Sequence, residues 1–274
     1  MELSYCKMPA LKNIYICFPG GKHKVLTMSF DDGRVEDRRL VQIFNEHGIR
    51  GTFNLNAGLH RDNRVPPQEY PALYSGHEVA CHTYLHPTIA RCPMEQVVEQ
   101  VMQDRRELEA IMGGPVRGLA YPNGSYSKEI MALLPALGIR YARVVGGTDD
   151  FAMPEDFMAW KSTCHHTHNL LENGRRFVEL HKTQYLYMMY VWGHSYEFTD
   201  MDNWDLMEQF CALAGGRADT WYATNIEIVD YMEQARRLQF TAAGDVVKNP
   251  NFSSVWLEVD GKIIEVPGGG TVKL

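Results

Sequence analysis

The chain has 274 residues, of which 45% are hydrophobic and 11% are aromatic, so a single large core can be buried. Its 27 basic and 34 acidic residues give a formal net charge of −7, which argues against a broad phosphate-binding surface and against nucleic acid as the default partner. The N-terminal residues show no apolar core after a basic start, and the longest apolar run, Tyr185 to Trp192, is too short to cross a bilayer. We therefore expect no membrane partner and a cytoplasmic location, and the oligomeric state stays open.

Short β-rich runs alternate with runs of helical period along most of the chain. Strands are expected at residues 24–30, 51–56, 77–83, 116–122, 140–146, 185–192 and 220–224. Helices are expected at residues 36–47, 94–112, 127–137, 170–182, 203–214 and 225–237. This alternation predicts an α/β fold, a distorted barrel of about seven parallel strands over residues 1–239.

The pattern changes from Phe240 onward. Strand-like alternation with turn signals follows, and Asp260-Gly261 is a favourable hairpin turn. A small C-terminal β-hairpin appendage is therefore expected over residues 240–274.

The stretch "LTMSFDDGR", Leu26 to Arg34, places two carboxylates directly after an apolar strand. In a β/α barrel the functional groups sit where strands end and the following loops begin. A glycine-containing turn at that point allows Asp31 and Asp32 to converge on one site, although such a dipeptide is also typical of a solvated turn.

A second strand end carries "HEVACHTYLHP", with His82 and His86 spaced i, i+4. This spacing predicts a helical turn with both rings on one face, closed by Pro87. Two imidazoles and one carboxylate leave coordination positions open, as a catalytic metal requires, whereas surface or packing histidines are the alternative.

Two further strand ends complete the candidate site. In "YVWGHSYEF" the apolar strand ends by presenting His194, a suitable proton donor for a leaving group. In "LAYPNG", Leu119 to Gly124, the turn exposes backbone N–H groups that can hold an oxyanion.

These stretches together resemble the polysaccharide deacetylase family, also called carbohydrate esterase family four or NodB-like deacetylases. "TMSFDDG", "HTYLH", "AYPNG" and "WGHSYE" follow the order of the family's motifs between Lys24 and Tyr196. The resemblance implies Asp31 as general base, His194 as general acid, and the N–H of Asn123 as oxyanion donor. It implies a set of three metal ligands: Asp32, His82 and His86.

The resemblance implies a metal-dependent deacetylase that removes N- or O-acetyl groups from a carbohydrate. Zinc is the expected divalent metal, and cobalt, nickel and manganese remain possible because an Asp-His-His site with open positions selects weakly. One alternative is a metal-dependent hydrolase of C–N bonds in small cyclic amides. Another is a barrel that binds carbohydrate without turning it over.

The chain departs from the family pattern at two places. The Asp-x-x-Asp-Trp motif that orients the catalytic histidine is missing, and the possible substitutes are Asp149, Asp150, Asp156 and Glu197. The arginine that pairs with the base is also missing, since Ala120 occupies its position. We expect Arg143 to replace it as the partner of Asp31, with a structural ion pair elsewhere or Arg117 as the alternatives.

Other side chains are expected near the substrate. Tyr121 lies in the same turn as Asn123, and Trp160 can stack on a sugar ring, although a core tryptophan is an equal alternative. The loop "TCHHTH" is expected to line the substrate cleft, and a second metal site is the less favoured reading of its possible ligands, Cys164, His165, His166 and His168.

Overall fold

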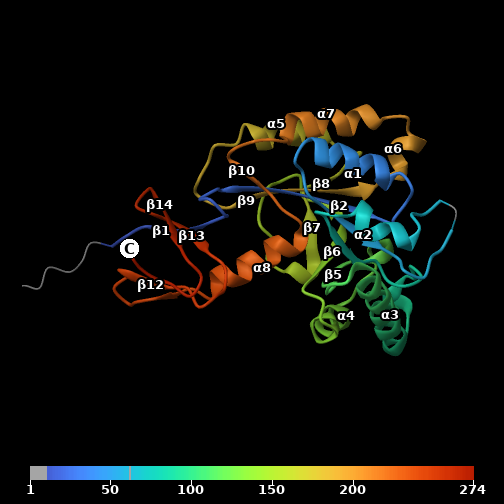
Figure 1. The fold of residues 1–274 in the computed structure, drawn as a ribbon, viewed down its shortest axis with the longest axis horizontal. Helices are drawn as coiled ribbons and strands as arrows, with labels where there is room; N and C mark the ends of the chain where they lie inside the picture. Colours follow the sequence, from blue (N-terminus) through green and yellow to red (C-terminus); the bar gives the residue numbers. More distant parts are fainter. Residues whose placement is uncertain (1–10, 62) are drawn as a thin grey trace, which may run out of the picture. The chain divides into compact units, whose positions relative to one another are not determined.

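The computed structural model describes residues 11–61 and 63–274 (Figure 1). It divides into two compact units, one formed by Lys24–Val229 and the other by Asp230–Leu274 with the described residues 11–23. The expected barrel region begins at residue 1, and its first ten residues, Cys6 among them, lie outside the described residues.

A nine-stranded parallel sheet forms the larger unit. Its strands are β2 (Lys24–Asp31), β3 (Gly51–Leu55), β4 (Glu78–Cys81), β5 (Gly118–Ala120), β6 (Tyr141–Gly147), β7 (Trp160–Ser162), β8 (Cys164–His165), β9 (Tyr187–His194) and β10 (Thr220–Tyr222). Their order is β7-β6-β5-β4-β3-β2-β9-β8, and β10 pairs with β2.

The ends of this strand order show that the sheet curves into a barrel. β7 and β8 stand at opposite ends of the order, yet only Thr163 separates them in the chain. The N–H of Thr163 donates to the carbonyl of Tyr190 on β9 over 2.8 Å, so this connection lies against both ends of the sheet. The expected distorted barrel is therefore confirmed, with the short strands β7 and β8 as members that the sequence did not indicate.

Helices connect the strands of this unit. They are α1 (Asp37–Glu46), α2 (Tyr70–Leu73), α3 (Met94–Met112), α4 (Lys128–Leu133), α5 (Leu170–Val178), α6 (Tyr196–Asp200), α7 (Trp204–Ala214) and α8 (Asn225–Arg236), which continues into the smaller unit. Short 3-10 turns are η1 (Pro67–Glu69), η2 (Ile89–Arg91), η3 (Pro122–Gly124), η4 (Leu134–Leu137) and η5 (Phe157–Ala159). The expected helix at 127–137 becomes a 3-10 turn near Pro135, which lacks the N–H that an α-helix needs.

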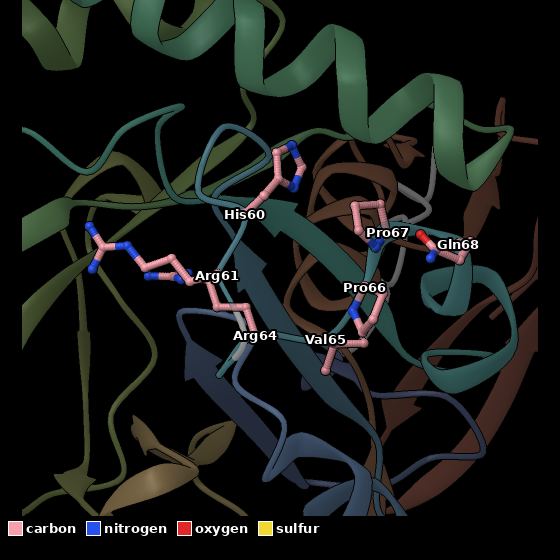
Figure 2. A pocket seen from close by; sticks show the side chains of 7 residues that line it. All are labelled: His60, Arg61, Arg64, Val65, Pro66, Pro67 and Gln68. Carbon is pink, nitrogen blue, oxygen red and sulfur yellow. The ribbon is translucent and has the colours of Figure 1, made fainter.

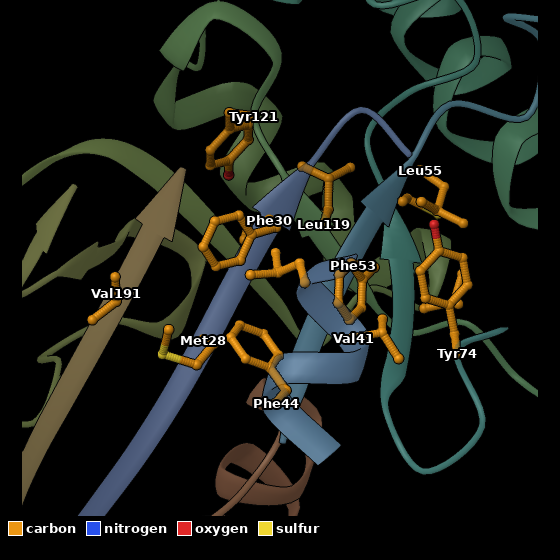
Figure 3. Packing of buried hydrophobic residues seen from close by; sticks show 14 of the residues in the cluster. Met28, Phe30, Val41, Phe44, Phe53, Leu55, Tyr74, Leu119, Tyr121 and Val191 are labelled. Atoms are coloured by element: carbon orange, nitrogen blue, oxygen red, sulfur yellow. The ribbon is translucent and has the colours of Figure 1, made fainter. Parts of the chain in front are cut away.

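The hydrophobic core fixes the position of β2 (Figure 3). Phe30 of β2 lies edge-on to Phe44 of α1 with ring centroids 5.8 Å apart, and Phe53 of β3 contacts Tyr74 with centroids 4.7 Å apart. Removing a buried phenylalanine typically costs about 3–5 kcal/mol. This packing holds the carboxyl end of β2, which carries Asp31, in one place.

The smaller unit contains two three-stranded antiparallel sheets. One sheet has β1 (Ile14–Cys17), β13 (Val255–Val259) and β14 (Lys262–Val266), and the other has β11 (Gln239–Phe240), β12 (Val246–Lys248) and β15 (Thr271–Lys273). The expected hairpin is present, since Asp260 and Gly261 have φ values of 48° and 79°, as a tight turn requires. Strand β1, which the sequence did not indicate, pairs with β13, so this unit takes residues from both ends of the chain.

The contacts within the structure divide the chain at residues 23/24 and 229/230. A domain boundary at residues 239/240, with a separate C-terminal domain over residues 240–274, stays a prediction. Among the described residues, no helix is long and apolar enough to cross a membrane.

Candidate metal and catalytic site

Three side chains expected to hold a metal come together at the carboxyl ends of β2 and β4. One ligand atom each from Asp32, His82 and His86 lies within 4.8 Å of the other two. The two imidazole rings are 4.7 Å apart between centroids and nearly perpendicular. The donor set of one carboxylate oxygen and two imidazole nitrogens fits a divalent cation such as zinc.

Adjacent carboxylates face one site because the backbone changes conformation between them. Asp31 is the last residue of β2 and is 3% exposed, whereas Asp32 has a left-handed φ of 82°. The N–H of Asp32 donates to the carbonyl of Asn54 on β3 over 2.9 Å, which holds this conformation. A left-handed backbone costs a residue other than glycine about 1–2 kcal/mol, and the neighbouring strand compensates for it.

The expected helical turn between the two histidines is wrong. Thr83 and His86 have φ values of 65° and 57°, which no right-handed helix contains, and the segment is a loop. The loop is held against α3, since the N–H groups of Tyr84 and Leu85 donate to the main chain and side chain of Gln100 over 2.9 and 2.8 Å. The rings therefore meet through loop geometry and not through helical spacing.

Buried partners fix the tautomer of His82. Its Nδ1 lies 2.8 Å from the carbonyl oxygen of Ala120 and therefore carries the proton, which leaves the Nε2 lone pair for a metal. The main-chain N–H of His82 donates to the buried carboxyl of Asp104 over 2.9 Å. Burial lowers the pKa of His82 to about 4, although the carboxylate of Asp31 opposes this, so the ring is neutral at pH 7.

Asp31 is a buried carboxylate held on both oxygens. Asn54 donates to Oδ1 over 2.8 Å, and the guanidinium of Arg143 contacts Oδ2. Burial alone would raise the pKa of Asp31, but the positive charge and hydrogen bond of Arg143 and the nearby imidazole of His194 outweigh it and lower the pKa below its usual value. The group is therefore ionised and able to accept a proton.

The arginine in contact with Asp31 comes from β6. Arg143 is 1% exposed, and its guanidinium lies over the ring of Trp192 at 4.4 Å from the centroid. The ion pair expected between Arg143 and Asp31 is present in the structure.

His194 lies directly beside Asp31, because the two are paired residues in the parallel register of β2 and β9. Glu197 of α6 holds it: its Oε2 is 3.3 Å from Nδ1 of His194 and accepts the main-chain N–H of the same residue over 3.2 Å. Burial would lower the pKa of His194, but the carboxylate of Glu197 close to Nδ1 and the charge of Asp31 raise it above the usual value.

Glu197 is the only one of the four possible substitutes that contacts His194 in the described part of the chain. Asp149 accepts from Asn173 over 3.0 Å and lies 3.3 Å from His168. Asp150 bonds to Thr148, and Asp156 caps η5. The sequence does not separate these carboxylates, because the choice depends on where α6 follows β9.

Two more histidines share the carboxylate of Glu197. Nε2 of His165 and Nε2 of His166 lie 3.2 and 2.7 Å from its Oε2. Burial would raise the pKa of Glu197, yet the close imidazoles of the three histidines, of which His166 is hydrogen-bonded, lower it far below the usual value. Cys164 and His168, the other members of the "TCHHTH" loop, do not join this cluster.

The "AYPNG" turn contacts the loop that follows the metal-ligand residue His86. Asn123 has a left-handed φ of 55°, and its side chain donates to Thr88 over 3.1 Å. Two hydrogen bonds from the N–H groups of Gly124 and Ser125 hold the turn, and the N–H of Asn123 takes part in neither. That N–H is therefore the candidate oxyanion donor of the turn.

Two aromatic residues expected at the substrate are buried instead. Tyr121 is 1% exposed, its hydroxyl donates to the carbonyl of Met158, and its N–H donates to the carbonyl of Arg143. Trp160 is fully buried and packs edge-on against Tyr141 and other rings. Stacking of Trp160 on a sugar is therefore corrected to a core position, because β7 turns this side chain into the barrel.

Sequence reasoning missed Arg64, which follows no motif. Its guanidinium contacts the carbonyl oxygen of Asp32 and lies 3.3 Å from Oδ1 of the same residue. Arg64 also lines a cavity of about 580 Å³, whose other lining residues are His60, Arg61, Val65, Pro66, Pro67 and Gln68 (Figure 2). Arg64 therefore connects this cavity with the metal-ligand group, because the same side chain lines the cavity and contacts Asp32.

Comparison with known proteins supports the resemblance found in the motifs. Residues 19–142 match the family model described as polysaccharide deacetylase, and the resemblance to that family is confirmed. Chitooligosaccharide deacetylases of Azorhizobium caulinodans and Sinorhizobium fredii are each 28% identical to this chain, over 47% and 41% of its length and 56% and 53% of theirs. The chain thus spans about half the length of the curated relatives it matches.

Solved structures show the same fold. A structure described as a putative polysaccharide deacetylase from Mycobacterium smegmatis has a TM-score of 0.62 at 16% identity and covers 81% of this chain and 94% of its own. A carbohydrate esterase family four pseudoenzyme from Bacillus anthracis has a TM-score of 0.50 at 16% identity, covering 79% of this chain and 68% of its own. The fold is therefore that of this family's barrels.

Proposed function

We propose that the protein is a metal-dependent deacetylase that hydrolyses N- or O-acetyl groups on a carbohydrate. The observation that carries the proposal is the placement of Asp31. This buried, ionised carboxylate lies between a three-ligand metal group and Arg143, beside a histidine whose pKa is raised. A base with a lowered pKa and an acid with a raised pKa, next to a metal group whose three ligands leave coordination positions free, suit hydrolysis by an activated water.

Asp32, His82 and His86 would hold the cation, and zinc is the metal that this donor set favours. When bound, the cation would lower the pKa of a water from 15.7 toward ~7 and polarise the acetyl carbonyl.

Asp31 accepts the proton of the attacking water in this proposal. The N–H of Asn123 donates to the oxyanion that forms on the acetyl carbonyl. His194 then donates its proton to the departing amine or alcohol, and Glu197 keeps its ring oriented for that step. We infer that Arg143 keeps Asp31 ionised before the water's proton arrives.

Metal analysis combined with acetate release tests the proposal. The purified protein should bind one equivalent of metal at the Asp-His-His group and release acetate from acetylated chito- or xylo-oligosaccharides. Metal at this group with no acetate from any acetylated sugar would favour either a hydrolase of small cyclic amides or a carbohydrate-binding barrel without turnover. The latter outcome has a precedent in fold, since the Bacillus anthracis neighbour is described as a pseudoenzyme.

His82→Ala and His86→Ala should each remove the metal from this group, because two remaining ligands bind a divalent ion weakly. Acetate release should fall with metal content. Metal content measured by mass spectrometry after dialysis checks this. His168→Ala is the matched control, since His168 is exposed and pairs with Asp149 away from the group. Full metal content in both variants would reject the ligand assignment.

Glu197→Gln should lower the pKa of His194, because it removes the negative charge that favours the protonated ring. The acid must be protonated, so the alkaline limb of the kcat profile should move to lower pH by about one unit or more. Asp156→Asn removes a carboxylate without contact to His194 and should leave the profile unchanged. An unshifted alkaline limb in Glu197→Gln would mean that another group holds His194.

A further inference from the structure

A second group of metal-binding side chains lies in the smaller unit, away from the motifs of the proposed function. Cys17 is the last residue of β1, His23 follows the next turn, and Glu258 lies on β13, which pairs with β1. One ligand atom from each lies within 4.8 Å of the others.

The distances between these atoms fit one tetrahedral ion. Sγ of Cys17 is 3.7 Å from Nε2 of His23, and that nitrogen is 3.0 Å from Oε2 of Glu258. Zinc binds sulfur at about 2.3 Å and nitrogen or oxygen at about 2.0–2.2 Å, so tetrahedral neighbours stand roughly 3.3–3.6 Å apart. These two distances lie just above and just below this range, and the third pair, Cys17 and Glu258, lies within 4.8 Å, so small side-chain movements would complete the geometry.

The backbone that carries two of the ligands is fixed before any ion binds. Phe18 and Lys22 form a tight turn in which the N–H of Phe18 donates to the carbonyl of Lys22 over 2.7 Å. Gly20 and Gly21 have φ values of 76° and 77°, and a Cβ at Gly21 would lie 2.5 Å from the side chain of Ile263. Such a preformed turn lowers the loss of conformational entropy on ion binding.

The burial of the three residues leaves a path for an ion. Cys17 is fully buried, whereas the side chains of His23 and Glu258 are 15% and 20% exposed. An ion can therefore enter past the imidazole and the carboxylate and reach the sulfur beneath them. The thiol loses its proton to solvent on binding, and the resulting thiolate and the carboxylate balance the two positive charges.

We propose that Cys17, His23 and Glu258 form a second divalent-cation site, with zinc as the ion that one sulfur, one nitrogen and one oxygen favour. The fourth position is left to water. The site fastens β1 to β13, strands from opposite ends of the chain, so ion binding stabilises the smaller unit. This proposal is independent of the deacetylase proposal.

Cobalt is the probe that separates the two sites. A thiolate bound to Co²⁺ gives a charge-transfer band in the near ultraviolet, and the group of Asp32, His82 and His86 contains no sulfur. Titration of the metal-free protein with Co²⁺ should produce the band in wild type and in His82→Ala. It should also appear in Cys92→Ser, the matched thiol control, and should be absent in Cys17→Ser.

No band in wild type at excess Co²⁺, or an undiminished band in Cys17→Ser, would overturn the proposal. If Cys17→Ser does not fold, two variants that keep the sulfur test the site instead. His23→Gln and Glu258→Gln should each weaken the Co²⁺ affinity, measured from the charge-transfer band, by at least about tenfold. Glu265→Gln on β14 is the matched carboxylate control and should bind as wild type does. Unchanged affinity in both His23→Gln and Glu258→Gln would also reject the site.

Discussion

Asp31→Asn should retain the metal and lose acetate release by about 10²–10⁴-fold, the usual effect of removing a general base. The amide has nearly the same shape as the carboxylate but cannot accept the proton of the water. Metal content and single-turnover acetate release, measured on the same preparation, check both parts of this expectation. A rate within a few-fold of wild type would assign the base to another group.

Asp32→Asn makes the same chemical change one residue later and should instead lower the metal content, since Asp32 is the carboxylate of the ligand group. Asn tolerates the left-handed backbone at this position, so the comparison is not confounded by strain. Loss of metal in both variants would make Asp31 a ligand as well. That result would reject the separation of base and ligand roles.

The stability of Asp31→Asn needs its own control. Both oxygens of Asp31 accept from donors, Asn54 on one and Arg143 on the other, so an amide nitrogen must face a donor in either orientation. An unsatisfied buried group of this kind costs about 1–3 kcal/mol. The folded fraction should therefore be measured by circular dichroism before a rate is interpreted.

The strands that carry the site could be predicted from sequence, and the conformations between them could not. The apolar runs before Asp31 and His194 are long and regular, so both strands were predicted with ends one or two residues before those observed. The loop between His82 and His86 was predicted as a helical turn, because spacing alone does not reveal left-handed residues such as Thr83. Positive φ at a residue other than glycine depends on tertiary contacts, here those with α3.

Long-range contacts explain the remaining differences. Glu197 could not be chosen over Asp156 from sequence, because the choice depends on the start of α6 after β9. β1 has only four residues and pairs with β13 from the far end of the chain, so local patterns give it little signal. A tryptophan is equally suited to stacking on a sugar ring and to packing in a core, and only the burial of Trp160 decides between the two.

Arg143→Met should destabilise the protein by about 3–5 kcal/mol and reduce turnover while leaving the metal ligands in place. The reason is that Asp31, 3% exposed, keeps its charge without its closest cationic partner. Burial, which the arginine now outweighs, would then raise the pKa of Asp31. Because the base must be ionised, the acidic limb of the rate profile should move to higher pH, and an unchanged profile would contradict the proposed role.

The stability of this variant should also depend on pH in a definite direction. In wild type the pKa of Asp31 is lowered, so its contribution to stability is present above the unfolded pKa, about 3.8, and is lost as pH falls through the lower folded pKa. With the folded pKa raised in Arg143→Met, the same group instead costs stability as pH rises from 3.8 toward the new pKa. Urea unfolding of metal-free protein should thus show a larger difference between wild type and variant at pH 7.5 than at pH 4.5.

A double variant separates loss of the charge pair from loss of packing. Asp31→Asn with Arg143→Met removes both buried charges, so at pH 7.5 it should be more stable than Arg143→Met alone, although it carries one more substitution. The arginine also lies over Trp192, and this contact is lost equally in both variants, so it cancels in the comparison. If the two substitutions added instead, the buried carboxylate would not be the source of the instability, and Arg143 would act through packing against Trp192.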